Sequence, residues 1–166
     1  ATGDDWDAEV TAGDISDATN AITVSNVAAP EITSAAYDAT AGTLVVTGTG
    51  FTSRDGQQDI DASMFTFTGE SSTTYTLVGS SDVEITSDTS FTITLDATDK
   101  AAINQIMNKA GTSSTNGVTY NLAAAEDWAR GADSAVVIAD LTGNGITVSN
   151  ITAPAITSAT YNTSSG

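Results

Sequence analysis

The chain contains no cysteine and no histidine among its 166 residues. Without cysteine it can form no disulfide, no thiolate zinc site and no cysteine nucleophile. Without histidine it lacks the side chain most used for proton transfer near neutral pH. Glu126 and Asp127 form a carboxylate pair, but adjacent side chains diverge and cannot face each other across a glycosidic bond. We therefore expect no enzymatic activity.

Basic residues are also scarce, with 4 Lys and Arg against 21 Asp and Glu and a net charge of −17. Phosphate groups are bound by clustered Lys and Arg, so nucleic acid and anionic lipid are excluded as partners. No apolar run approaches the roughly 18 residues that a membrane-spanning helix requires. We expect no membrane insertion.

Long helical periodicity is rare, whereas Thr, Ser, Val, Ile and Gly are abundant, which favours a mainly β fold. One helix is predicted at about 98–109, because Asp96 is a capping residue, apolar residues share one helical face after it, and Gly111 follows as a stop. Short segments rich in β-branched and aromatic residues, separated by Gly, Ser and Asp, predict strands. These segments are 21–26, 32–37, 43–49, 64–68, 74–78, 83–86, 90–96, 118–122 and 135–138.

One stretch of the sequence occurs twice. Residues 21–42 and 145–166 are identical at 13 of 22 positions with a constant offset of 124 residues, which is typical of a whole repeated domain. We interpret 1–26 as the C-terminal part of a preceding repeat, 30–150 as one complete repeat and 154–166 as the first strand of a following repeat. Only about four residues, ending in proline, separate successive repeats, so neighbouring repeats are expected to be held near-rigid.

Two segments carry a resemblance to a known family. Residues 30–37 (PEITSAAY) and 42–51 (GTLVVTGTGF) resemble the opening of bacterial immunoglobulin-like modules of the IPT/TIG kind. The complete repeat is similar to the tandem modules of very large secreted bacterial proteins, adhesins among them. The resemblance implies an immunoglobulin-like Greek-key β-sandwich in tandem repeats, outside the cell or on its surface. The helix is a departure from a plain module of this kind and leaves the strand order open.

The acidic residues suggest calcium. Of the 21 acids 16 are Asp, and short carboxylates on turns are common Ca²⁺ ligands. The first candidate site is Asp55, Asp59 and Asp61, where Asp59 and Asp61 flank Ile60 and would point to one side of an extended segment. The alternative is that Asp55 belongs to an ordinary Asp-Gly turn, and that the acids form only a soluble surface.

A second candidate calcium site lies beside the linkers. An ion held between the end of one repeat and the start of the next would stiffen the string, because it binds only when both parts are in place. Turn capping by the same Asp and Asn side chains is the alternative. The candidate residues are Asp133, Asp140 and Asn144, with Asp14, Asp17 and Asn20 in the earlier copy.

These observations predict a structural module of an extracellular bacterial fibre, filament or adhesin stalk, stiffened by Ca²⁺, whose partners are neighbouring copies of the repeat. A second possibility is a module that binds a surface glycan or protein, with Trp128 either in the core or in a sugar-stacking platform. A third is a subunit that polymerises by strand complementation through the open edges of its partial repeats.

Overall fold

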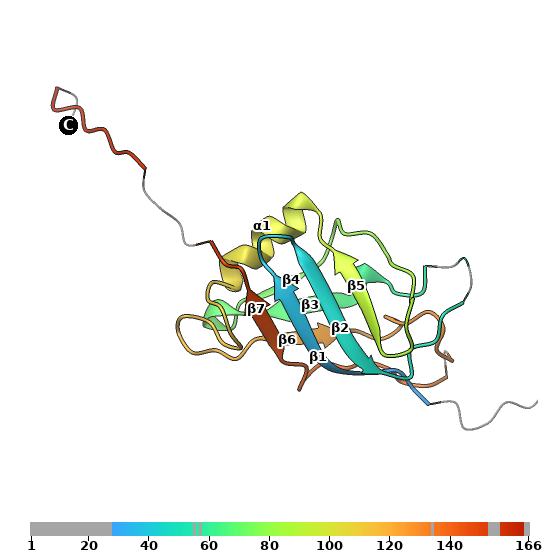
Figure 1. Ribbon diagram of the computed structural model, residues 1–166. Coiled ribbons are helices and arrows are strands. Elements are labelled where there is room, and N and C mark those ends of the chain that lie inside the picture. Colours follow the sequence, from blue (N-terminus) through green and yellow to red (C-terminus); the bar gives the residue numbers. More distant parts are fainter. Residues whose placement is uncertain (1–27, 55, 57, 134, 153–156, 165–166) are drawn as a thin grey trace, which may run out of the picture.

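A computed structural model of the chain describes residues 28–54, 56, 58–133, 135–152 and 157–164. The described part is mainly β, as predicted, with two sheets and one α-helix (Figure 1). The elements are β1 (Glu31–Asp38), β2 (Thr43–Thr49), the 3-10 turn η1 (Ala62–Met64), β3 (Phe65–Thr68), the 3-10 turn η2 (Glu70–Ser72), β4 (Thr74–Thr76), β5 (Ser90–Thr94), α1 (Ala97–Ile106), β6 (Asn121–Ala124) and β7 (Ile146–Ser149).

The strands form one sheet of order β5-β2-β1-β7 and another of order β4-β3-β6. All strand pairs are antiparallel except β1 and β7, which are parallel. Because the first and last strands run in the same direction, the chain reaches the module at one end and leaves it at the opposite end (Figure 1). We call these ends the N-terminal face and the C-terminal face.

A bulge in β1 explains its unusual hydrophobic spacing. The register between β1 and β2 shifts between Ile32 and Ser34, and the buried side chains of the strand are Ile32, Ala35 and Tyr37. An extra residue in one strand moves all later side chains to the other face. The bulge therefore brings both parts of the strand to the same core although their spacing is three residues and then two.

The core lies between the two sheets and is rich in aromatic rings. Tyr37 of β1 meets Phe67 of β3 with the ring centroids 6.2 Å apart, and Phe91 of β5 meets Phe65 of β3 at 5.9 Å. Trp128 is fully buried beside Phe65, at 5.8 Å, and its Nε1 donates to the carbonyl of Ile138 at 2.8 Å. Edge and tilted contacts of this kind favour a specific arrangement of the sheets. The interpretation of Trp128 as a core residue is confirmed.

The predicted helix is present as α1, somewhat shorter than expected. Asp96 caps it by accepting a hydrogen bond from the Asp99 amide at 2.7 Å, and Ile103 and Ile106 are buried. The helix ends at Ile106 because Met107 takes a non-helical conformation and is itself buried in the core. Of the described helices none has the length and apolar content needed to cross a bilayer.

Two of the strands predicted within the described residues are wrong, and the strand predicted at 21–26 lies outside these residues. In 83–86 only Val83 pairs, through an isolated bridge to Ile60. In 135–138 the amide of Ile138 donates to the carboxylate of Glu126 at 3.0 Å, and its carbonyl accepts from Trp128. Side chains thus satisfy backbone groups that a strand would have paired.

Candidate functional site

The loop proposed for calcium contains a buried carboxylate with its own donors. Asp59 is fully buried, and its Oδ1 accepts from the backbone amide of Arg54 at 3.1 Å and from the Arg54 Nε at 3.4 Å. Its Oδ2 accepts from the amide of Ile85 at 3.1 Å. Asp59 therefore joins two loops and is neutralised by an arginine of the same module. Asp55 lies outside the described residues.

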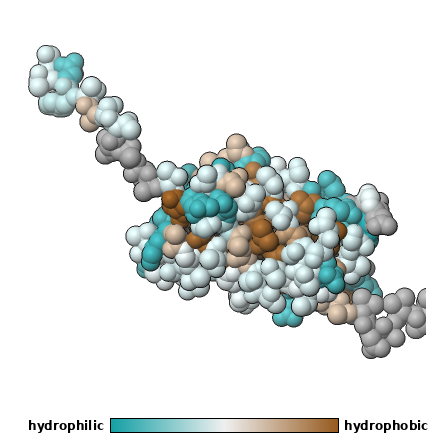
Figure 2. Space-filling model, in the orientation of Figure 1, coloured by the Kyte–Doolittle hydropathy of each residue, from teal (hydrophilic) through white to brown (hydrophobic). Residues whose placement is uncertain are grey.

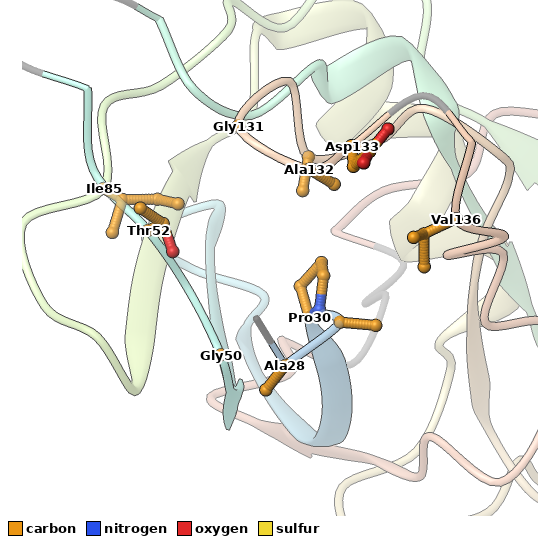
Figure 3. Close-up of a pocket in the computed structure, with 11 residues that line it drawn as sticks. Ala28, Pro30, Gly50, Thr52, Ile85, Gly131, Ala132, Asp133 and Val136 are labelled. Carbon is orange, nitrogen blue, oxygen red and sulfur yellow. The ribbon is translucent and has the colours of Figure 1, made fainter. Parts of the chain in front are cut away.

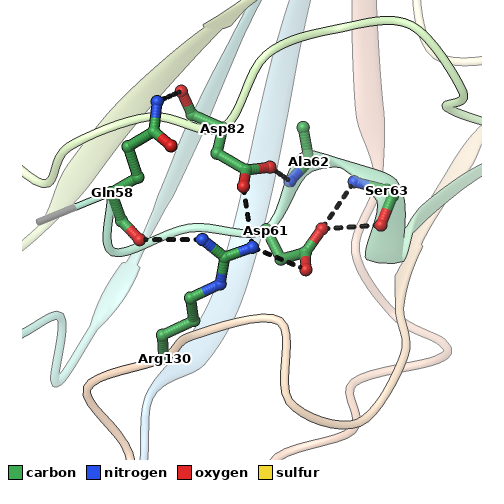
Figure 4. A network of polar contacts seen from close by, with 6 residues as sticks. All are labelled: Gln58, Asp61, Ala62, Ser63, Asp82 and Arg130. Atoms are coloured by element: carbon green, nitrogen blue, oxygen red, sulfur yellow. Dashed lines mark hydrogen bonds and ion pairs between the residues drawn. The ribbon is translucent and has the colours of Figure 1, made fainter.

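Asp61 belongs to a separate network at the surface, drawn in Figure 4. One nitrogen of Arg130, Nη2, lies 2.9 Å from Asp61 Oδ2 and 2.7 Å from Asp82 Oδ2. Asp61 also caps η1 by accepting from the amide and hydroxyl of Ser63. Burial opposes ionisation of Asp61, but the hydrogen bonds from Ser63 and Arg130 outweigh it and lower the pKa of its carboxyl. A guanidinium thus stands between two carboxylates at this place.

The structure brings together two of the residues predicted beside the linkers. Asn144 is buried, and its Nδ2 donates to Asp140 Oδ1 at 2.8 Å and to the Leu122 carbonyl at 3.1 Å. Asp140 Oδ2 accepts from the amide of Ile32 at 2.9 Å. The pair therefore fixes the start of β1 to the turn before β7 within one module. Asp133 caps its own turn through the Ala135 amide at 2.9 Å, and Asp14, Asp17 and Asn20 lie outside the described residues.

Within the described ranges no group of three or more acidic side chains converges in a way that could hold a metal ion. Each described Asp among the candidates has protein donors instead. Asp61 and Asp133 cap their own turns, as the alternative for Asp133 predicts, whereas Asp59 and Asp140 accept hydrogen bonds from distant segments. The calcium site stays a prediction from the sequence.

Sequence reasoning missed the most heavily bonded carboxylate of the described module, Asp99. Its oxygens accept from the hydroxyls of Tyr75 and Ser80, at 2.9 and 2.6 Å, and from the amides of Val78, Gly79 and Ser80, at 2.8–3.3 Å. Burial opposes ionisation, but the Ser80 and backbone donors outweigh it and lower the pKa of Asp99 to about 2.

The turn that surrounds Asp99 requires a glycine at position 79. A Cβ on Gly79 would lie 2.2 Å from Asp96 Oδ2, so a larger residue could not let the amide of this turn approach the carboxylate. The local signal in the sequence is the run Gly79-Ser80, but nothing in it indicates a partner 20 residues away. The arrangement anchors the segment after β4 to the first turn of α1.

The N-terminal face carries a small, mostly apolar pocket of about 40 Å³ (Figure 3). Its walls come from the start of the module, from the segment after β2 and from the loop after Trp128, and the Pro30 ring and the Ala132 and Val136 side chains point into it. Val136 is 42% exposed and Val137 80% exposed, so this face ends in an uncovered apolar loop. Asp133 stands at the rim.

The C-terminal face has a larger hollow of about 330 Å³. Near the end of β1 the hydroxyl of Tyr37 donates to Asn104 Oδ1 at 2.8 Å, and burial raises the pKa of Tyr37 to about 12. On the side drawn in Figure 2 apolar residues form small separate areas, one of them beside the segment by which the chain leaves the module. The lining residues are Ala39, Thr40, Lys100, Asn104, Met107, Ile151 and Thr152.

Comparison of the chain with family models, with curated proteins and with solved structures gave no match.

Proposed function

We propose that the chain is a structural repeat module of an extracellular bacterial fibre, filament or adhesin stalk. The observation that carries the proposal is the parallel pairing of β1 and β7, which puts the two ends of the module on opposite faces. Copies joined by linkers of about four residues would then follow one another head to tail and extend, whereas ends on one face would make the copies fold back. The repeat at an offset of 124 residues supplies the copies.

The strand order supports an immunoglobulin-like Greek-key sandwich as the fold of this module. Such sandwiches place their first, second and fifth strands in one sheet and their third and sixth strands in the other. Here β1, β2 and β5 share a sheet, and β3 and β6 share the second. In this proposal α1 occupies the connection between the fifth and sixth strands. Two strands differ from the constant-type arrangement, since β4 pairs with β3 and β7 pairs with β1.

The distribution of aromatic side chains favours a structural role over glycan binding. Sugar-binding surfaces present exposed aromatic rings, but Trp128, Tyr37 and Tyr120 are buried. The one large exposed aromatic of the described residues is Tyr161, at 81%. Tyr161 matches Tyr37 of β1 in the repeat, where the same side chain is 1% exposed. We propose that a sandwich of a following repeat covers it.

Strand complementation is the second candidate function, and the exposure of Tyr161 favours it as well. Residues 157–162 match residues 33–38 of β1, but their side chains are exposed and not packed in a core. They could therefore pair with another subunit and not with a following repeat of the same chain. Titrating a synthetic peptide of residues 154–166 into the folded chain separates the two. Saturable binding with protection of strand amides supports complementation, and an absence of binding supports a continuous string.

The net negative charge is the reason that calcium is part of the proposal. Modules of this chain repel one another at a net charge of −17, and divalent cations would reduce this repulsion and stiffen the string.

The experiment that tests the structural role uses a longer polypeptide with several complete modules. Residue 166 matches residue 42, so each additional copy of 43–166 fused after Gly166 adds one complete module at a natural junction. We expect the maximum dimension from small-angle X-ray scattering to rise by a constant step per copy. The step should exceed the length of β1, roughly 26 Å for 8 residues. A compact particle whose maximum dimension grows far more slowly would contradict the proposal.

A further inference from the structure

The linker between repeats is almost entirely occupied by contacts with the modules on either side. Ile151, its first residue, is partly buried, packs against the core of the module that it leaves, and lines the hollow of the C-terminal face together with Met107. Ile151 matches Val27 at the repeat offset. The same position would therefore be anchored on the preceding module in each copy.

The last residues of the linker are fixed on the module that follows. Pro30 is buried in the N-terminal face, and the carbonyl of Ala29 lies directly over Gly50. A Cβ at Gly50 would come within 2.8 Å of that carbonyl oxygen, and Gly50 has a φ of +70°, so glycine is needed on both counts. The chain is thus held against this face from Ala29 onward.

Only one linker residue lies between these two anchors. This residue is Thr152, and Ala28 is the equivalent residue in the earlier copy. Thr152 lines the C-terminal hollow, and Ala28, its match in the repeat, lines the N-terminal pocket. The two anchors are therefore two residue steps apart, which is at most about 7 Å between their Cα atoms. Two successive modules cannot stand apart at that distance, so their faces must touch.

We propose that the C-terminal face of one repeat docks directly on the N-terminal face of the next copy, and that the exposed loop carrying Val136 occupies the hollow lined by Met107 and Ile151. This inference rests on the proposed function, in which copies follow one another in one chain. The two faces are complementary in polarity: Val136 and Val137 are exposed on the N-terminal face and Ile151 is only partly buried in the hollow, so docking would remove apolar area of both faces from water.

The faces are also complementary in charge. Arg54 and Arg130 are paired with acids of their own module, whereas Lys100 stands at the C-terminal face, where its Nζ donates to the Thr40 carbonyl. Asp133 stands at the rim of the N-terminal pocket. An interface between the two faces would bring this scarce basic side chain to the acidic rim of the next copy, which favours a single orientation.

The test uses the full chain extended by a second copy of 43–166, so that it contains two complete modules joined by the natural linker. Because the chain has no cysteine, Thr74→Cys in each module gives two unique sites for nitroxide labels, on exposed positions of β4. Double electron–electron resonance then measures the distribution of distances between the modules.

We expect one narrow distance distribution. Val136→Asp in the second module should broaden it at least about twofold, as should a Gly-Ser-Gly-Ser insertion after Thr152. Val45→Asp is the matched control, because Val45 is 38% exposed but lies on the outer face of the β2 sheet, and it should leave the width unchanged. Thermal melting of each variant confirms that both modules are folded.

A broad distribution in the unmodified two-module polypeptide, or a narrow one that Val136→Asp leaves unchanged, would overturn the inference. An extended particle with two folded but independently moving modules would overturn the interface alone and leave the proposed function standing. A compact particle in the scattering experiment would contradict the proposed function itself, so this outcome is distinct from the loss of the interface alone.

Discussion

Asp99 and Asp61 are carboxylates of the same strongly acidic chain, yet the fold compensates their charges by different means. Asp99 is buried and accepts hydrogen bonds from backbone amides and two hydroxyls, with no cation among these donors. Asp61 is near the surface and shares the Arg130 guanidinium with Asp82. Oriented backbone dipoles in a buried site stabilise an anion without any counter-charge, whereas an exposed ion pair competes with water and salt. The two sites should therefore respond to different perturbations.

The largest expected effect is at Asp99. Asp99→Asn keeps the shape of the side chain but turns an NH₂ group toward amides that need an acceptor, and each buried donor left unpaired costs about 1–3 kcal/mol. We expect the free energy of unfolding to fall by roughly 2–4 kcal/mol, measured by urea denaturation. Asp88→Asn makes the same charge change at an exposed position and should change stability by under about 0.5 kcal/mol. Equal effects of the two variants would contradict the role assigned to Asp99.

The second effect is the pH dependence that Asp99 confers. Its pKa is lowered from 3.8 to about 2 in the folded protein, so the unfolded chain binds the proton more tightly. The stabilisation is fully present above the unfolded value and is lost as the pH falls through about 2. Melting temperature should fall below about pH 5, more steeply in the wild type than in Asp99→Asn. Parallel curves for the two proteins would contradict this assignment.

The contrast between these sites also marks how much the sequence could predict. Strands β2 and β5 alternate apolar and polar residues locally, and α1 has its cap at Asp96, so their signals lie within a few neighbouring residues. The mainly β class followed from these. The partners of the Asp99 and Arg130 side chains come from 19 to 72 residues away in the chain, and no local pattern encodes such distances.

The partners of the carboxylates could likewise be predicted only in part from the sequence. That Asp59 and Asp61 would project from the same loop on one side was a reasonable prediction, but Ile60 lies between a buried Asp59 and a half-buried Asp61 with separate partners. Arg130 is one of only 4 basic residues, and its neighbours in the sequence carry no signal of a counter-ion role. Its role as counter-ion appears only when the turn after Trp128 is folded against the loop at Asp82.

Calcium would compensate carboxylate charge by a third means, in addition to the amides at Asp99 and the guanidinium at Asp61. For an extracellular module with a dissociation constant of about 0.1–1 mM, 1 mM Ca²⁺ stabilises the fold by about 0.4–1.4 kcal/mol. We expect the melting temperature of the full chain to fall when EGTA replaces Ca²⁺, and Asp55→Asn and Asp140→Asn to reduce that difference. An unchanged melting temperature would contradict the calcium prediction and leave Asp59 and Asp140 with purely structural roles.

The smallest effect is expected at the surface network of Arg130. Arg130→Gln leaves Asp61 and Asp82 facing each other without a cation, but both carboxylates reach solvent, so the free energy of unfolding should fall by only about 0.5–1 kcal/mol. The loss should shrink in 1 M NaCl, where the screening length is about 3 Å. Asp99→Asn should keep its full effect in the same salt, because its donors are neutral amides and hydroxyls that bond to a buried carboxylate, and these bonds are little screened.

Lys109→Gln is the control for this variant, since it removes one positive charge at an exposed position outside the network. If it destabilises the protein as much as Arg130→Gln, the loss reflects the net charge of −17 and not the pairing with Asp61 and Asp82. If only Arg130→Gln is destabilising, and only at low salt, the guanidinium acts as a local counter-ion. The contribution of the Arg130 network to the free energy of unfolding then depends on ionic strength, whereas the contribution of the Asp99 site does not.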